Sequence, residues 1–337
     1  SMDSRGTKSV GPYQATLFGA INGLTFPYAR TSLTAVQTME WDELHYLSLA
    51  HEEVLTSGGL KADVSVTYSI SEPGTEVLRA LELISESLTV KAGLRYPAIR
   101  SRQQNLSLFG KFEMRDSESE QLSTVTSRDR LRLIRTGFEY DYSDALNGVN
   151  QFNVEYSRGL GILNATEDND PLKSRSDAER DFSKFLITAS RTQELWANWS
   201  AYLGIQGQVA LNGLSSSEEC GFGGESYGRA YDSSEITGDN CIMGSLELRY
   251  LFRPESKDSL LKYAQLIGYY DLGQTTQRTV LNTQAKANSA SSASIGLRLG
   301  FDHNVTAFGE VAKPLTRDAS EQGDDDVRVF GKISVSF

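Results

Sequence analysis

A long, glycine-framed segment, residues 212–242, contains the side chains best suited to charged chemistry. Arg229 lies directly after Gly228, and Gly223 and Gly224 precede them in the same stretch. Glycine allows backbone conformations that other residues resist, so these positions favour a folded loop that presents one cation. A phosphate-binding loop is not indicated, because the spacing is not G-x-x-x-x-G-K and no helix is expected to follow.

Asp271 is the carboxylate that we expect this cation to meet. It lies in an alternating segment in which Leu266 and Tyr270 share one face, whereas Tyr269 and Asp271 share the other. If the segment crosses a bilayer, the face that carries the carboxylate must point away from lipid, where a charge is destabilising. An arginine–carboxylate pair is directional and can be bidentate, so it would hold the loop against the wall of a barrel.

The elements that must position these residues are β-strands, because apolar and polar residues alternate with period two along most of the chain. From Val64 to Ile70, for example, every second residue is apolar and the residues between them are Ser or Thr. The polar face repeatedly carries Lys, Arg, Glu and Gln, whereas the apolar face carries few charges. The expected strands are 13–24, 28–38, 43–55, 60–71, 86–96, 104–115, 131–143, 148–158, 182–192, 197–211, 243–253, 259–272, 291–301, 304–315 and 327–337.

The connections between these strands alternate in length from 60–71 onward. An outer-membrane β-barrel has short periplasmic turns and long outer loops, so the pattern predicts an all-β fold, a transmembrane antiparallel β-barrel. A soluble β-sandwich is the alternative, but it has no reason to alternate its connections so regularly. The short connections are 56–59, 97–103, 144–147, 193–196 and 302–303, and the long ones are 71–85, 116–130, 159–181, 212–242, 273–290 and 316–326.

The number of strands leads to a further expectation. Fifteen are expected here, and closed barrels of this type normally have an even number, so we expect sixteen in the native protein. The missing strand lies upstream or is supplied as a stub by residues 1–10, unless two short strands within 28–55 have been merged. Residues 1–12 are expected to form the start of the barrel with a cloning remnant at Ser1-Met2, and residues 13–337 the barrel itself.

The composition argues against several classes of protein. The chain has 337 residues with 33 Lys+Arg and 44 Asp+Glu, a formal net charge of −11, and without a basic cluster we expect no nucleic-acid binding. The sequence contains no apolar run of about 18 residues, so no transmembrane helix is predicted. His45, His51 and His303 are scattered and the acidic run 324–326 is expected to be solvated, so no metal, cofactor or enzymatic activity is expected.

Several short motifs occur in one order and span almost the whole chain. One is the terminal aromatic residue, Phe337, at the end of an alternating strand, an arrangement typical of bacterial outer-membrane barrels, whose assembly machinery reads it. The others are Asp3-Ser4-Arg5-Gly6 with Gly11, Ser71-Glu72-Pro73-Gly74, Tyr96-Pro97-Ala98-Ile99-Arg100-Ser101-Arg102, Gly228-Arg229-Ala230-Tyr231-Asp232, Tyr269-Tyr270-Asp271-Leu272-Gly273 and Val311-Ala312-Lys313-Pro314-Leu315.

This ordered set resembles the outer-membrane transporters of two-partner secretion. These are the haemolysin and filamentous-haemagglutinin secretion/activation proteins of the polypeptide-transporting barrel superfamily. The family's loop motif is Val-Arg-Gly-Tyr, and here Gly228 replaces the Val and Ala230 replaces the Gly, so the loop geometry can differ. The family's periplasmic POTRA domains and plug helix are not expected within this chain, which resembles the barrel alone.

The resemblance implies a monomeric outer-membrane pore of type V secretion. A large partner exoprotein, an adhesin or haemolysin, would cross it unfolded. Further implied partners are the barrel assembly machinery and outer-membrane lipid or lipopolysaccharide. Arg229 and Asp271 would lock the inward-folding loop to the barrel wall. The residues implied to form the loop and its lock are Gly223, Gly224, Gly228, Arg229, Tyr231, Asp232, Tyr269 and Asp271.

Alternatives remain open from the sequence. An assembly factor of the same superfamily would share the arginine-bearing loop, whereas a passive porin would not need it. Arg229 could instead be a surface residue paired with Glu225 or Glu235.

Two cysteines, Cys220 and Cys241, bracket the loop 21 positions apart. Two antiparallel strands at its base would bring them within reach of a disulfide, which an oxidising compartment permits. In the chain-entropy model such a bond contributes about 3 kcal/mol. Two unpaired thiols are the alternative.

Overall fold

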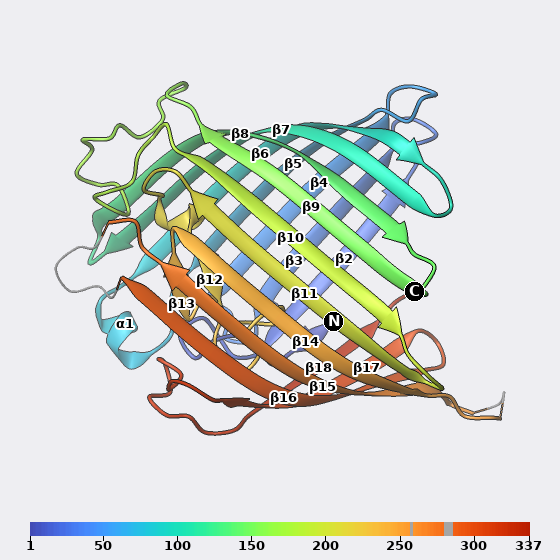
Figure 1. The fold of residues 1–337 in the computed structure, drawn as a ribbon. Coiled ribbons are helices and arrows are strands. Elements are labelled where there is room, and N and C mark those ends of the chain that lie inside the picture. Colours follow the sequence, from blue (N-terminus) through green and yellow to red (C-terminus); the bar gives the residue numbers. More distant parts are fainter. Residues whose placement is uncertain (257–258, 280–285) are drawn as a thin grey trace.

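The structure, a computed structural model, describes residues 1–256, 259–279 and 286–337. In these residues sixteen strands close into one antiparallel barrel (Figure 1). The elements are β1 Met2–Asp3, β2 Gln14–Asn22, β3 Arg30–Thr38, β4 Leu44–Val54, β5 Lys61–Ser71, α1 Glu76–Ala80, β6 Ile84–Arg100, β7 Gln104–Gln121, β8 Thr124–Ser143, β9 Gly148–Gly159, β10 Ser183–Glu194, β11 Trp199–Ala210, η1 Ser216–Glu218, β12 Cys220–Phe222, β13 Ile236–Gly238, β14 Asn240–Phe252, β15 Leu261–Thr276, β16 Ala287–Phe301, β17 Val305–Pro314 and β18 Arg328–Val335.

The ring is closed by β1, which is two residues long. Met2 pairs with Ile333 of β18 on one side and with Ala15 of β2 on the other. Along the rest of the ring each strand pairs with the next in sequence, except that β11 pairs with β14 across β12 and β13. The prediction of a sixteen-stranded barrel is therefore confirmed for the described residues, and the sandwich alternative is wrong. The sixteenth strand is a stub within residues 1–10, and Met2, expected to be part of a cloning remnant, belongs to it.

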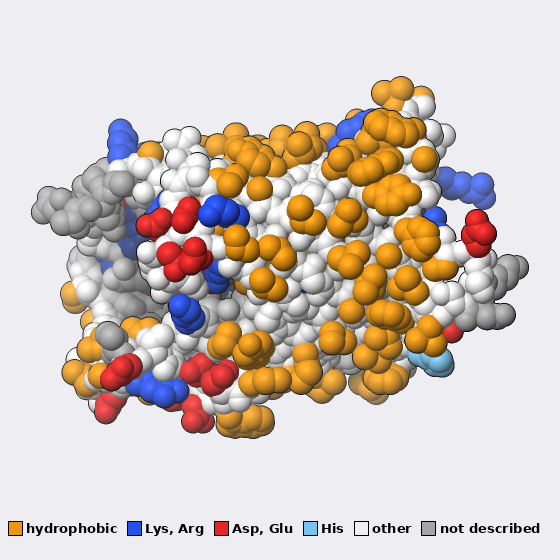
Figure 2. Space-filling view, turned by 90° about the horizontal axis from the view of Figure 1, so that it is seen from below, with side chains coloured by type: hydrophobic (Ala, Val, Ile, Leu, Met, Phe, Trp, Pro, Cys, Tyr) orange, Lys and Arg blue, Asp and Glu red, His pale blue; other side chains and the backbone are white. Residues whose placement is uncertain are grey.

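The wall of the barrel has two faces of opposite character, as the alternation predicts. In β15, Leu266 and Tyr270 are 48% and 43% exposed, whereas Ile267 and Asp271 are 1% exposed. Figure 2 shows hydrophobic side chains spread over the wall and charged side chains gathered toward its two ends, most of them at one. This is the distribution that a strand crossing lipid requires, because lipid contacts only the outward side chains. No helix in the described residues is long and apolar enough to cross a membrane.

The prediction of a loop at residues 116–130 is wrong, because β7 and β8 continue through this segment to a turn at Leu122 and Ser123. Cross-strand partners stabilise the extension. Ser117 Oγ lies 3.2 Å from Ser87 Oγ on one face, and the Glu118 carboxylate pairs with Arg128 on the other. The extension carries polar side chains on both faces, so it lacks the apolar alternation that marks the other strands.

Smaller departures concern the ends of elements. The strand β6 continues to Arg100 with an irregular register between Pro97 and Ile99, where a turn was expected. The connection 71–85 contains the short helix α1, which no pattern predicted. The last strand ends at Val335 and not at Phe337.

Long connections fold inward and fill one end of the lumen. Beyond the last β8–β9 pair, the connection 160–182 covers the edge of β8, and Thr166 N donates to the Arg130 carbonyl at 3.0 Å. Side chains of the connections then pack against inward residues of the wall. The main apolar clusters are Leu131, Leu133, Phe182, Ala210 and Leu214, and Cys220, Phe222, Tyr231, Ile236, Met243, Ala290 and Ala319.

Candidate functional site

The connection from β11 to β14, residues 211–239, folds into the lumen, and we refer to it as the inward loop. Its strands pair with Cys220 opposite Gly238 and Phe222 opposite Ile236. Both strands lie within the outline of the barrel in Figure 1. Phe222 and Ile236 are buried, so the loop has an apolar core and is a folded unit.

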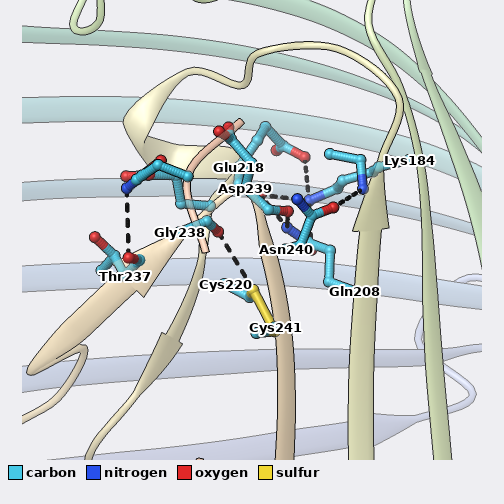
Figure 3. The surroundings of a disulfide bond; sticks show 12 residues. Lys184, Gln208, Glu218, Cys220, Thr237, Gly238, Asp239, Asn240 and Cys241 are labelled. Atoms are coloured by element: carbon cyan, nitrogen blue, oxygen red, sulfur yellow. Dashed lines mark hydrogen bonds and ion pairs between the residues drawn. A yellow bond between two sulfur atoms is a disulfide. The ribbon is translucent and has the colours of Figure 1, made fainter. Parts of the chain in front are cut away.

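A disulfide ties the inward loop to the barrel wall. It joins Cys220 of β12 to Cys241 of β14, with Cα atoms 6.3 Å apart. Figure 3 shows the bond close to Glu218 and Asp239, two buried carboxylates of the same loop. The prediction of a disulfide is confirmed, and the alternative of two unpaired thiols is wrong.

Glycines shape the tip of the loop, residues 223–235. Gly223 has φ +127°, and a Cβ there would lie 2.0 Å from the Asp232 carbonyl oxygen. Gly228 has φ +81°, and a Cβ there would lie 2.6 Å from the Phe222 ring. Gly224 also has positive φ. A side chain at Gly223 or Gly228 is therefore opposed both by backbone strain and by contact.

Arg229 is the centre of a buried polar cluster. Its guanidinium donates to Asp271 at 2.6 Å and to Glu247 at 2.8 Å. It also donates to the Ser245 hydroxyl at 2.9 Å and lies 4.1 Å from the centre of the Tyr269 ring. All these partners are inward residues of β14 and β15. Water has little access to a cation that is enclosed in this way by carboxylates and an aromatic ring, so it cannot readily replace these contacts.

The backbone of the loop also forms hydrogen bonds to the Asp271 carboxylate. The Gly228 and Arg229 amides each donate to Asp271 Oδ2 at 3.1 Å, while the Arg229 side chain occupies Oδ1. Burial alone would lower the pKa of Arg229, but Asp271 and Glu247 outweigh it and the pKa is raised. One carboxylate thus holds both the side chain and the backbone of the tip.

The alternative partners of Arg229 lie elsewhere. Glu225 is exposed and 3.9 Å from Lys332. Glu235 accepts from the Ser320 amide at 2.9 Å. The reading of Arg229 as a surface residue is therefore wrong.

Tyr231 and Asp232 fasten the tip to other parts of the wall. The Tyr231 hydroxyl, on a side chain 1% exposed, donates to the Ser291 carbonyl at 3.0 Å. Asp232 pairs with Arg328 of β18 at 2.6 Å, and Arg328 also donates to the Ala230 carbonyl at 3.0 Å. The tip is thus held by strands from β14 to β18.

Arg5, which belongs to the first sequence motif but had no expected role, completes this side. It pairs with Glu310 of β17, donates to the Arg229 carbonyl at 3.4 Å and lies 4.4 Å from the centre of the Phe330 ring. Its position in the first motif was the available signal, but alternation says nothing about a residue in a connection.

A second cluster, around Glu218, was missed by sequence reasoning. Its carboxylate lies 2.8 Å from Arg135 of β8, 2.8 Å from Lys184 of β10 and 3.5 Å from Arg115 of β7. The side chain is 1% exposed. Burial alone would raise its pKa, but Lys184 and Arg135 lower the pKa to about 2. The three cations lie in strands that the sequence predicted, but nothing in the sequence pointed to Glu218 as their partner.

A third cluster joins three connections at Asp239, which is fully buried. Arg175, from the β9–β10 connection, donates to it at 2.7 Å. The amides of Leu214 and Arg278 each donate to it at 2.9 Å. The pKa of Asp239 is lowered, because these donors outweigh the effect of burial.

The remaining candidate residues are outside these clusters. Phe337 lies beyond the end of β18 and is fully exposed. His303 lies in the turn between β16 and β17 with positive φ. Asp325 pairs with Lys313 at 3.4 Å. The described residues contain no group of three or more His, Cys, Asp or Glu side chains that could hold a metal ion.

These features define a class of protein: a membrane-spanning barrel, apolar outside and polar within, whose lumen holds an inward loop anchored by buried ion pairs. The chain belongs to the haemolysin secretion/activation protein family ShlB/FhaC/HecB, whose family model matches residues 29–299. It is accordingly a β-barrel of the bacterial outer membrane.

Individual relatives support this assignment. The heme/hemopexin transporter protein HuxB of Haemophilus influenzae strain 86-028NP is 22% identical over 318 residues, which are 94% of this chain and 56% of HuxB. The outer membrane transporter CdiB of Dickeya dadantii strain 3937 is 26% identical over 167 residues, which are 49% of this chain and 29% of CdiB. The chain thus spans about half the length of HuxB.

Solved structures share the fold. CdiB from Escherichia coli superposes with a TM-score of 0.85 at 18% identity, over 100% of this chain and 62% of that one. BamA from Haemophilus ducreyi, lacking POTRA domains 1–3, gives a TM-score of 0.69 at 11% identity, over 99% of this chain and 69% of that one. At these identities the likeness concerns the barrel fold alone.

Proposed function

We propose that this barrel is the outer-membrane pore of a two-partner secretion transporter, through which a large partner exoprotein is exported unfolded. The observation that carries the proposal is the buried contact of Arg229 with Asp271 and Glu247. A passive channel has no need of an arginine enclosed between two carboxylates inside its lumen. A transporter that must stay closed without its partner does need such a closing contact.

In this proposal the tip of the inward loop is the closing element. Glu247 and Asp271 belong to the rigid wall, and Arg229 belongs to the tip, so the ion pair sets where the tip rests. Removing one partner of a buried ion pair typically costs about 3–5 kcal/mol, because the other charge is left buried without compensation. Export then requires the tip to leave its position, and folding of the partner outside the cell would supply the driving force.

Further partners follow from the two surfaces of the barrel. The apolar outer wall would contact outer-membrane lipid and lipopolysaccharide. The exposed terminal Phe337 would be read by the barrel assembly machinery. We expect a monomer that transports and performs no catalysis.

The test is single-channel recording in planar bilayers with the unaltered chain, Arg229→Ala, Asp271→Ala and the double variant. We expect each single variant to be noisier and to conduct more, because the tip has lost its contact. The double variant should resemble the single ones, because both substitutions break the same contact. The control is Arg298→Ala, since this exposed arginine contacts the Gln265 amide oxygen at 3.3 Å and not the loop.

Steady and identical currents from all variants would show that the loop does not close the pore, and would favour a passive porin. An effect of Arg298→Ala as large as that of Arg229→Ala would show that any lumenal arginine matters, and would remove the special role of the tip.

A further inference from the structure

The inward loop contacts two separate parts of the barrel wall. Its tip contacts β14 and β15 through Arg229, and Arg5 links the Arg229 carbonyl to Glu310 of β17. Its stem, residues 213–219, contacts the wall through Glu218, which reaches Arg115 of β7. The strands that bind the Arg229 side chain, β14 and β15, and those that bind the Glu218 side chain, β7, β8 and β10, have no member in common, and β11 lies between the two groups in the ring.

The stem contact is enclosed to a degree similar to that of the tip contact. The Glu218 side chain is 1% exposed, and Arg135 and Lys184 are 12% and 8% exposed. Lys184 also donates to the Glu218 carbonyl at 2.7 Å, and Gln208 donates to the same oxygen at 3.1 Å. The wall therefore holds both the side chain and the backbone of Glu218, as Asp271 holds both parts of Arg229.

The disulfide separates the two contacts along the chain. Arg229 lies inside the covalent ring that Cys220 and Cys241 close, and Glu218 lies just outside it. Because Cys241 belongs to β14, a pull on the tip is transmitted through the disulfide to the wall before it reaches the stem. Release of the tip therefore does not by itself release Glu218.

We propose that Glu218, with Arg135 and Lys184, forms a second and independent anchor of the inward loop, so that full opening of the pore needs two separate releases. This inference rests on the proposed function, in which the loop closes the pore. Glu218 is a positioning residue: it acts through the stem of the loop, which it fixes to β8 and β10, strands that do not bind the Arg229 side chain.

Independence has a quantitative consequence. Free energies of contacts that share no partner add, so their effects on the open fraction multiply. If Glu218→Gln and Arg229→Ala each raise the open fraction about tenfold, the combination should raise it about a hundredfold, up to saturation. Arg229→Ala with Asp271→Ala should not exceed the larger single effect, because these residues share one contact.

The experiment is single-channel recording at neutral pH on the purified chain, with Glu218→Gln, Arg229→Ala and their combination. Glu218→Gln keeps the shape of the side chain and removes only its charge. Lys184→Gln breaks the same anchor from the wall side and should act in the same direction. Glu218→Asp, which keeps the charge, should lie closer to the unaltered chain than Glu218→Gln does.

The matched control is Glu52→Gln, which removes one charge from β4, away from the inward loop, where the side chain is 43% exposed. It should leave the current unchanged, alone and combined with Arg229→Ala. Folding of each variant is checked by the heat-dependent mobility of the barrel in SDS gels. A role of Glu218 in folding alone would change that mobility without multiplying the open fraction.

The outcomes separate this inference from the proposal on which it rests. If Arg229→Ala alone leaves the current unchanged, the loop does not close the pore and the proposed function fails. If Arg229→Ala opens the pore and adding Glu218→Gln or Lys184→Gln brings no further increase, the second anchor is overturned and the tip contact suffices. A multiplied open fraction with intact folding supports two anchors.

Discussion

Two walls of the same lumen, β14–β18 and β2–β5, treat charged side chains differently. On β14–β18, Glu247, Asp271 and Glu310 are at most 5% exposed, because the inward loop and the first residues of the chain cover them. On β2–β5, Thr38 is the single residue in the buried class. The two walls share the same alternation, so the difference arises from which wall the loop covers.

The contrast shows that the contribution of an ion pair to stability depends on whether a connection packs over it and excludes solvent. Lys61 and Glu52 on the uncovered wall are 2.7 Å apart but 39% and 43% exposed. Arg229 and Asp271 are 2.6 Å apart and 9% and 1% exposed. The distances are alike, yet solvent screens the first pair and is excluded from the second.

The largest expected effect is the difference in the barrel's free energy of unfolding when one or the other of these two ion pairs is broken. Arg229→Ala should destabilise the barrel by about 3–5 kcal/mol, because Asp271 and Glu247 remain buried without their cation. Lys61→Ala should cost less than about 1 kcal/mol. Urea unfolding in detergent micelles, followed by tryptophan fluorescence, measures both. Equal losses would show that burial by the loop does not distinguish the walls.

The next effect is that of the disulfide, which joins the loop to the covered wall. Replacing Cys220 and Cys241 by Ser should lower the free energy of unfolding by about 3 kcal/mol in the chain-entropy model. Reductant should shift the unfolding midpoint of the unaltered chain in the same direction and leave that of the double variant where it is. A midpoint that ignores reductant in the unaltered chain would contradict the role of this bond.

A smaller effect is expected from one methyl group added to the tip of the loop, compared with one added to the uncovered wall. Gly223→Ala combines a backbone angle of φ +127° with a Cβ 2.0 Å from the Asp232 carbonyl, and should cost about 1–3 kcal/mol while raising the single-channel current. Gly19→Ala on β2 meets nothing within 4 Å and should change neither quantity. A current that is unaltered by Gly223→Ala would show that the shape of the tip does not matter for closure.

The titration of Glu218 is expected to have the smallest effect, because it should leave the single-channel current unchanged at neutral pH. Its pKa in the folded chain, about 2, is below the ordinary 4.5, so its contribution is complete above about pH 4.5 and is lost as the pH falls toward 2. Currents of the unaltered chain, recorded from pH 7 downward, should rise only in that window. The charged groups that face Glu218 or its partners are Glu113 and Arg115 of β7, Arg135 of β8, Glu155 of β9 and Lys184 of β10.

The Glu218→Gln variant supplies the control for this titration. Its current should already be raised at neutral pH, and the rise between about pH 4.5 and 2 should be smaller than in the unaltered chain. A rise of the same size in both would assign the pH response to other carboxylates.

The alternation of residues was sufficient to predict most of the wall. Lipid on one side and polar lumen on the other impose a period of two, and this placed Asp271 and Tyr269 inward. The same argument failed for residues 116–130, because polar residues lie on both faces of the strands there and no apolar period remains. It also missed α1, whose five residues are too few to show a helical period.

The candidate site was predictable only in part. Arg229 was singled out by its glycine neighbours, and Asp271 was the inward carboxylate expected to meet it. Glu247, Glu218 and Arg5 had no comparable signal. Each is one of many charged residues in the chain, and local spacing does not tell which of them a distant loop will cover.

The order of strands, the two faces of most strands, the long connection at 212–242 and the placing of two cysteines within reach of each other were contained in the amino-acid sequence, because they depend on neighbours within one or two strands. The path of the inward loop, with Arg229 bound to β14 and β15 and Glu218 bound to β7, β8 and β10, was decided only by the tertiary structure. The strands of the closed ring present many charged side chains to the lumen, and burial under the loop selects which of these charges pair with it.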